Sequence, residues 1–300
     1  MRLKARAPLR IDFAGGWTDV PLYADDKGGA VLNAAITRYV TGHLARPDAE
    51  GILHVLRGDR SYVSYTLDLP SGSGLGSSAA QNVLWLALVK TSIDNSSSRS
   101  EIAEMACRLS EMLGILGGKQ DEYAAALGGI HFFSFDGTVE AQPLDLPLSF
   151  QDEMRSRLVL VYSGKSRLSG SIHEHVWSGY TAGHGPVHAA LNGLKRVAVE
   201  MKVALDQRNF EVFSDLLNEN WTYQKELHPS VTNADLDELF DFAFTHGARS
   251  GKACGAGGGG CCVFAVESGG AERLRAALKT RKIEVIDFDF DTYGVFVSKG

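Results

Sequence analysis

The residues with the clearest chemical purpose are the glycines and serines that run from Pro70 to Ala80, Pro-Ser-Gly-Ser-Gly-Leu-Gly-Ser-Ser-Ala-Ala. This loop leads directly into an apolar segment whose spacing predicts a helix over 77–91. Free backbone amides and the positive end of a helix dipole then meet at one place, which suits a phosphate group. The hydroxyls of Ser77 and Ser78 fall in the first helical turn, where one of them can bind a phosphate-bound Mg²⁺. The stretch therefore predicts a nucleotide site.

The loop differs from the two commonest nucleotide-binding motifs. No Gly-Lys-Ser/Thr follows its glycines, so it is not a Walker A loop. Gly72, Gly74 and Gly76 also lack the acidic residue that completes a dinucleotide fingerprint. A plain tight turn before a helix stays open as the structural alternative.

A second glycine-rich segment, Gly255–Gly260, follows Lys252. Five glycines in six positions indicate a backbone that something approaches closely. The alternative is a flexible linker, which the apolar run over 261–266 disfavours because that run must be buried.

Charged and hydroxyl side chains surround a glycine turn near the N-terminus. A predicted strand delivers Arg10 and Asp12, and the turn that follows delivers Thr18 and Asp19. Such groups can bind a polyol through paired hydrogen bonds. An ordinary surface pair of Arg10 with Asp12 is the alternative.

A carboxylate follows the double glycine Gly117-Gly118. In Lys119-Gln120-Asp121, the aspartate falls at the start of a short predicted helix over 120–127. It can accept a proton from a hydroxyl nucleophile. Its alternative role is to stabilise the helix dipole.

Composition limits the class of protein. A chain of 300 residues that is 44% hydrophobic can bury a large core and suggests two domains. The net charge of −6 gives no reason to expect nucleic acid as a partner. The four cysteines form neither a disulfide framework nor a zinc pattern, and no apolar run has the length of a membrane span or signal peptide. We expect a cytoplasmic protein without a membrane partner.

The predicted elements indicate an α+β protein. Pro143 and Pro147 bracket a break that divides it into domains 1–153 and 154–300. The first half is predicted to contain strands at 8–14, 30–44, 62–67 and 130–133, and helices at 77–91, about 102–113 and 120–127. The second half is predicted to contain strands at 158–162, 261–266, 283–288 and 293–298, and helices at about 187–205, 209–226, 233–246 and 271–281.

Taken together, the four segments resemble the GHMP kinase family, which includes galactokinase, homoserine kinase, mevalonate kinase and phosphomevalonate kinase. Pro70–Ala80 is similar to the family's phosphate loop, Lys252–Gly260 to its C-terminal glycine loop, and Arg10–Asp19 to its first motif. The resemblance implies an N-terminal domain of the ribosomal-S5 domain-2 type and a ferredoxin-like C-terminal domain. The active site would lie in the cleft between them.

The resemblance also implies roles for individual residues. Asp121 would be the base and Arg10 would stabilise charge on the transferred phosphoryl group. The ATP phosphates would contact Gly72, Gly74, Leu75, Gly76, Ser77 and Ser78. The substrate would contact Asp12, Gly16, Trp17, Thr18, Asp19, Lys119, Gly257, Gly258 and Arg167. Mg²⁺, brought with ATP, would be bound by Ser78 and by a helix carboxylate that is either Glu111 or Glu104.

Within the family, Gly16-Trp17-Thr18-Asp19 and Gly118-Lys119-Gln120-Asp121 resemble the branch that phosphorylates the anomeric hydroxyl of sugars. The implied substrate is D-glycero-D-manno-heptose 7-phosphate or a related hexose or heptose. A free sugar such as L-fucose, mannose or galactose is the alternative, and a non-catalytic sugar and nucleotide sensor is a further one. Lys165 and Arg167 would hold a sugar phosphate or form a solvated basic turn. His173, His175, His184 and His188 favour a substrate-contacting loop or plain surface over a metal site. The oligomeric state stays open, a homodimer being one option.

Overall fold

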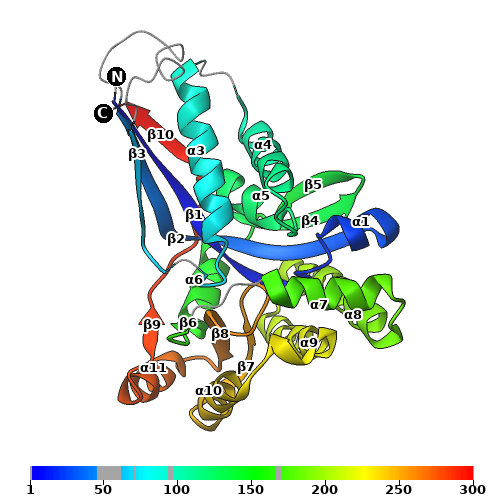
Figure 1. The fold of residues 1–300 in the computed structure, drawn as a ribbon. Coiled ribbons are helices and arrows are strands. Elements are labelled where there is room, and N and C mark those ends of the chain that lie inside the picture. Colours follow the sequence, from blue (N-terminus) through cyan, green and yellow to red (C-terminus); the bar gives the residue numbers. More distant parts are fainter. Residues whose placement is uncertain (1, 46–61, 71, 94–96, 166–169, 300) are drawn as a thin grey trace.

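The computed structural model describes residues 2–45, 62–70, 72–93, 97–165 and 170–299. Among these residues, one antiparallel sheet has the order β10-β1-β2-β4-β5, with β3 also paired to β2 (Figure 1). Its strands are β1 (Arg2–Ala14), β2 (Gly29–Ala45), β3 (Tyr62–Leu67), β4 (Ile130–Asp136), β5 (Thr138–Pro143) and β10 (Phe296–Lys299).

Strand β1 changes character along its length. From Leu3 to Ala7 buried apolar residues alternate with exposed ones, as expected of a sheet with one covered face. From Leu9 onward both faces are buried, including the polar Arg10 and Asp12. Two register shifts against β2, at Pro8/Leu9 and Asp12/Ala14, bracket these two polar residues. Such irregularities re-aim side chains, and they are frequent next to functional sites.

Three helices from the first half of the chain lie over one face of this sheet (Figure 1). They are α3 (Ser77–Ile93), α4 (Arg99–Met112) and α5 (Gln120–Leu127). Helix α3 buries the apolar side chains whose spacing predicted it, including Val83, Leu84 and Leu88. Helix α4 begins with a capping box, because the side chains of Ser98 and Glu101 each accept a hydrogen bond from the other's backbone amide.

The second sheet is also antiparallel, with the order β7-β8-β6-β9. Numbered along the chain this order is 2-3-1-4, and a helix separates β8 from β9, which is the ferredoxin-like arrangement. Its strands are β6 (Leu158–Tyr162), β7 (Ala248–Ala253), β8 (Cys261–Val266) and β9 (Glu284–Ile286). Helices α9 (Phe210–Leu227), α10 (Ala234–Thr245) and α11 (Ala271–Thr280) pack against it, whereas α8 (Gly185–Asp206) packs against α9 and against β1 and β2 of the first sheet. The predicted α+β class is confirmed.

The C-terminal strand joins the first sheet. Residues 293–298 were expected as a strand of the second half, but β10 begins at Phe296 and pairs antiparallel with Leu3–Arg6 of β1. Helix α6 (Leu148–Arg157) spans the predicted boundary between 153 and 154. The two predicted domain ranges therefore stay a prediction, and the first sheet draws on both.

Several short elements were not predicted. Helix α1 (Pro21–Lys27) has only seven residues, and η1 (Pro229–Val231) is a single turn. Helix α7 (Gly170–Thr181) has no charge pattern that marks its ends. Strand β7 has the sequence Ala-Arg-Ser-Gly-Lys-Ala, without the large apolar residues of a typical strand, and is stabilised by its pairing with β8. No helix within the described ranges is long and apolar enough to cross a bilayer.

Candidate active site

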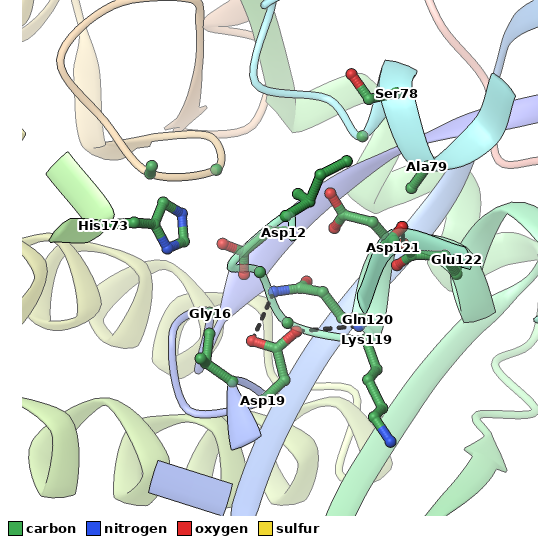
Figure 2. A pocket seen from close by; sticks show the side chains of 18 of the residues that line it. Asp12, Gly16, Asp19, Ser78, Ala79, Lys119, Gln120, Asp121, Glu122 and His173 are labelled. Carbon is green, nitrogen blue, oxygen red and sulfur yellow. Dashed lines mark hydrogen bonds between the residues drawn. The ribbon is translucent and has the colours of Figure 1, made fainter. Parts of the chain in front are cut away.

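A cavity of about 310 Å³ lies where the end of β1, the start of α3, the start of α5 and the loop between β7 and β8 meet (Figure 2). Sequence segments far apart contribute to its wall. The structure brings together most of the predicted site residues there: Arg10, Asp12, Gly16, Trp17, Asp19, Gly72, Gly74, Gly76, Ser77, Ser78, Glu111, Lys119, Asp121 and Gly257.

The phosphate loop has the backbone that its glycines permit. Gly72, Gly74 and Gly76 adopt φ values of 77°, 77° and 75°, in the left-handed region where other residues are strained. Helix α3 begins at Ser77, so the amides of its first turn lack partners within the helix. Ser77 is buried, whereas Ser78 is exposed and keeps its hydroxyl available. This geometry fits the binding of an anionic phosphate.

The two glycine loops lie against each other. A Cβ atom on Gly74 would meet the Cys254 carbonyl oxygen at 2.6 Å, and one on Gly260 would meet the Ser73 carbonyl oxygen at 2.6 Å. The Cys261 amide also donates to the Ser73 carbonyl, at 2.7 Å. The second loop was predicted to approach something closely, and here its neighbour is the backbone of the first loop.

Arg10 and Asp121 form an ion pair beside the phosphate loop. The Arg10 Nε and Nη2 atoms are each 2.7 Å from Asp121 Oδ1, and Nη1 donates to the Gly74 carbonyl at 2.6 Å. A Cβ on Gly76 would stand 3.3 Å from the Asp121 carboxylate, so the loop touches that carboxylate directly. Burial opposes the charge on Arg10, but Asp121 and Asp12 outweigh it and raise the pKa of the guanidinium. The two predicted catalytic residues are therefore in contact.

Asp12 is bound by a residue whose role the sequence did not reveal. Lys252 of β7 is fully buried, and its Nζ donates to Asp12 Oδ2 at 2.9 Å and to the Asp12 carbonyl at 2.6 Å. This ion pair joins the two sheets. Asp12 Oδ1 has no hydrogen-bond partner among the described residues, although it is buried on the cavity wall. It is thus available to accept a hydrogen bond from a bound molecule.

Asp19 is held by the start of α5. The Gln120 amide donates to Asp19 Oδ2 at 3.0 Å, and the Gln120 side chain contacts Oδ1 at 3.5 Å, as the dashed lines in Figure 2 show. A Cβ on Gly118 would collide with this carboxylate at 1.8 Å, which explains why a glycine occupies position 118. Burial is the largest cause that raises the pKa of Asp19, to about 7.

Trp17 forms an aromatic wall with a histidine of α7. The rings of Trp17 and His173 stack with centroids 4.4 Å apart and an interplanar angle of 30°. Trp17 Nε1 is buried without a hydrogen-bond partner, and the residue holds φ at 82°, an uncommon value for a side chain of this size. Burial lowers the pKa of His173 to about 4, so this ring is neutral at pH 7. His173 lines the cavity, which agrees with the substrate-contacting alternative.

Some predicted residues are not on the cavity wall. Leu75 is buried in the core, and its carbonyl accepts from the Arg10 amide. The single hydrogen of the Thr18 hydroxyl lies within reach of the carbonyls of Gly15 and Ala30, and its oxygen accepts from the Ala30 amide. These hydrogen bonds stabilise the turn, and the Thr18 side chain is fully buried. Gly258 donates its amide to the Val231 carbonyl.

The predicted basic turn is described only in part. Arg167 lies outside the described residues. Lys165, by contrast, is exposed and forms an ion pair with Asp235. Lys119 lines the cavity, but its side chain extends away from Asp12 and Asp121 in Figure 2.

Oxygen ligands suited to Mg²⁺ are present in the wall. Ser78 and Glu111 both line the cavity and are exposed. Glu104 is used elsewhere, since its carboxylate accepts from the Tyr123 hydroxyl and pairs with Arg108. Hydroxyl and carboxylate oxygens are the donors that Mg²⁺ prefers, so this wall fits the ion that the resemblance implies. Within the described ranges, no three His, Cys, Asp or Glu side chains cluster as a metal site of their own.

Two family models match the chain. One, described as GHMP kinases N terminal domain, matches residues 48–129, and the other, described as GHMP kinases C terminal, matches residues 201–284. Together they cover more than half of the chain, and the first contains the phosphate loop and Asp121.

Similar proteins of known name and structure agree. A D-glycero-alpha-D-manno-heptose 7-phosphate kinase from Campylobacter jejuni is 31% identical over 98% of this chain and 98% of its own length. A bifunctional fucokinase/GDP-fucose pyrophosphorylase from Arabidopsis thaliana is 28% identical over 97% of this chain, which spans 32% of that longer protein. The crystal structure of a D-glycero-D-manno-heptose 1-phosphate kinase from Bacteroides thetaiotaomicron matches with a TM-score of 0.78 and 26% identity, covering 99% of both chains.

Proposed function

The chain belongs to the GHMP kinase family, and on this premise we propose that it transfers the γ-phosphoryl group of ATP to the anomeric hydroxyl of a sugar. The observation that carries the proposal is the contact of Arg10 with Asp121 at 2.7 Å, against the backbone of Gly74 and Gly76. A charge-stabilising cation and a proton acceptor are thereby set beside a phosphate loop. Phosphoryl transfer depends mainly on such positioning and charge neutralisation.

In the proposed reaction the anomeric oxygen of the sugar attacks the γ-phosphorus of ATP. The bond between the γ-phosphorus and the oxygen that bridges it to the β-phosphate breaks, and ADP leaves. Asp121 accepts the proton of the attacking hydroxyl, a contribution of about 10²–10⁴ to the rate. Arg10, which pairs with Asp121, neutralises charge on the transferred group. A Mg²⁺ ion, when bound, would neutralise charge on the phosphate oxygens, with Ser78 as one ligand and a nearby carboxylate as another.

The polar groups left over on the wall support a polyol as substrate. Asp12 Oδ1 can accept a hydrogen bond and Trp17 Nε1 can donate one, and neither has a partner within the described part of the chain. Asp19 adds a second acceptor, which Gln120 orients. Gly16 leaves room beside them, because a Cβ there would meet Asp12 Oδ2 at 2.4 Å. We assign these groups to the sugar ring.

We propose D-glycero-D-manno-heptose 7-phosphate or a related hexose or heptose as the substrate. The support is the 31% identity over nearly the whole chain with a heptose 7-phosphate kinase. A free sugar such as L-fucose is the second candidate, and it is favoured by one observation. Lys165, one of the two cations expected to hold a sugar phosphate, is paired with Asp235. The four cysteines are free and buried, which supports a reducing compartment such as the cytoplasm.

A screen of substrates tests the proposal. The protein is incubated with ATP, Mg²⁺ and each of fucose, mannose, galactose and heptose 7-phosphate, and ³¹P NMR monitors the anomeric phosphate signal. We expect one sugar to give a sugar 1-phosphate. Consumption of ATP with no phosphorylated sugar, or no turnover with any sugar of the panel, would contradict the assignment. If heptose 7-phosphate is the substrate, Arg167→Ala should raise its KM more than that of a free sugar.

A further inference from the structure

Glu122 is a buried carboxyl group that the proposed reaction leaves unused. Only 5% of the residue is exposed, yet it lines the same cavity as Ser78 and Asp121. The Ser110 hydroxyl donates to Glu122 Oε1 at 3.0 Å. The other oxygen, Oε2, has no partner within the described ranges. Figure 2 shows Asp121 and Glu122 extending from the start of α5 on the side of the cavity where Ser78 and Ala79 lie in the first turn of α3.

The charges around Glu122 leave this carboxyl without a counter-ion. Arg10 pairs with Asp121 and Lys252 pairs with Asp12, but no Lys or Arg of the described residues forms an ion pair with Glu122. Burial is the largest cause that raises the pKa of Glu122, to about 8, and the nearby carboxyl groups of Asp121 and Asp19 add to it. An isolated buried carboxylate is costly unless a cation or a hydrogen-bond network compensates it. The missing component is a positive charge near Oε2.

We propose that Glu122, rather than Glu111, supplies the carboxylate that binds the divalent cation of the metal–nucleotide complex, and that Ser110 orients it. The inference rests on the proposed function. Ser110 fixes one oxygen of Glu122 and leaves the other free, which is how a ligating carboxylate is commonly held. Glu111 lies in the last turn of α4 and is exposed. That turn carries the negative end of the helix dipole, an unfavourable place to concentrate carboxylate charge.

Binding of Mn²⁺ in the presence of a non-hydrolysable ATP analogue tests this without any turnover. The loss of the free Mn²⁺ signal in electron paramagnetic resonance gives the metal affinity. We expect Glu122→Gln to weaken Mn²⁺ binding by about tenfold or more, the scale seen when the ligand environment of a metal is disturbed. Affinity for the analogue alone, measured with a chelator, should not change. Ser110→Ala should produce a smaller loss, and Glu122→Asp should restore part of the affinity.

Two further variants separate the alternatives. Glu111→Gln tests the competing assignment, and Glu272→Gln is a matched control on the exposed surface of α11, where the carboxylate is 91% exposed. Both should keep the Mn²⁺ affinity of the unaltered chain. Since a glutamine can still accept from Ser110, we expect Glu122→Gln to fold, which its thermal unfolding checks.

The outcomes are distinct. Unchanged Mn²⁺ affinity in Glu122→Gln would overturn the inference, because Glu122 would then serve only to join α4 and α5 through its hydrogen bond with Ser110. Loss of affinity in Glu111→Gln would assign the metal to that residue instead. Failure of the unaltered protein to bind the Mn²⁺ complex would instead contradict the proposed kinase function itself, so the two failures are separable.

Discussion

Replacement of Asp121 by asparagine tests the proposed base most directly. Asparagine has nearly the same shape, and its side-chain oxygen can still accept the two Arg10 contacts that now measure 2.7 Å. The change removes the ability to take a proton while it leaves the phosphate loop and the cavity wall in place. We therefore expect nucleotide binding to survive and turnover to fall.

The expected loss follows from the role of a general base. Its removal lowers kcat by about 10²–10⁴, which corresponds to about 3–5 kcal/mol in the barrier. An anomeric hydroxyl is more acidic than an ordinary alcohol, so the lower part of this range is expected. The stability effect should be smaller. The Asp121 side chain is 27% exposed, and solvent screens its pairing with Arg10, so the free energy of unfolding should fall by only about 1–2 kcal/mol.

Two measurements separate chemistry from binding. A coupled assay of ADP release gives kcat and KM, and calorimetry with ATP and Mg²⁺ gives nucleotide affinity. Asp287→Asn is the control, because that carboxylate is 84% exposed and pairs only with Arg275 among the described residues. A kcat close to that of the unaltered chain would refute the base assignment for Asp121. Loss of nucleotide affinity together with kcat would instead assign Asp121 to binding.

Three other perturbations address the loops and the buried charges. Gly74→Ala should weaken nucleotide binding, because the added Cβ would stand 2.6 Å from the Cys254 carbonyl. Gly114→Ala is the control for backbone strain alone, because Gly114 has a φ of 70° and a Cβ there would meet nothing within 4 Å. Calorimetry compares the nucleotide affinities of the two variants. Lys252→Met should lower the free energy of unfolding in urea by about 3–5 kcal/mol, because it leaves the buried Asp12 carboxylate unpaired. Burial raises the pKa of Asp19 from 3.8 to about 7, so its contribution to stability is present below pH 3.8 and is lost as the pH rises through 7. The Asp19→Asn variant should accordingly show a flatter decline in stability over that window, by up to about 1.4 kcal/mol per pH unit, in urea titrations; parallel curves would contradict the shifted pKa.

Much of the fold could be predicted because its elements carry strong local patterns. The helices α3 and α5 and the strands β6 and β8 match their predicted ranges closely, since their apolar spacing and flanking glycines leave little choice. Strand β7 could not be predicted, because Arg249, Ser250 and Lys252 give it a polar sequence that only pairing with β8 makes extended. The pairing of β10 with β1 could not be predicted either, since no local signal specifies pairing across nearly 300 residues.

The site residues likewise include some that the sequence predicts and others that only the structure reveals. Glycine loops and Asp121 are visible in the sequence because their spacing is local. The role of Lys252 is not visible, since its partner Asp12 is 240 positions away. Thr18 shows the converse: its hydroxyl lies within a polar motif and was predicted to contact the substrate, whereas its hydrogen bonds in the structure go to the backbone of the turn. A sequence shows which polar groups are present, whereas only the fold shows which of them are already satisfied.

The contact between the glycine loops has a consequence for how the site forms. Gly74 and Gly260 each allow the opposing backbone to approach more closely than any side chain would permit. Lys252, near the end of β7 and before the second loop, is fixed by Asp12 on β1. The contacts of Arg10 with Gly74 and Asp121 lie within the first half of the chain. The contacts of Gly74 with Cys254, of Ser73 with Cys261 and of Asp12 with Lys252 join this half to the second sheet. The first half therefore places Arg10 beside the phosphate loop, and docking of the second sheet completes the nucleotide site.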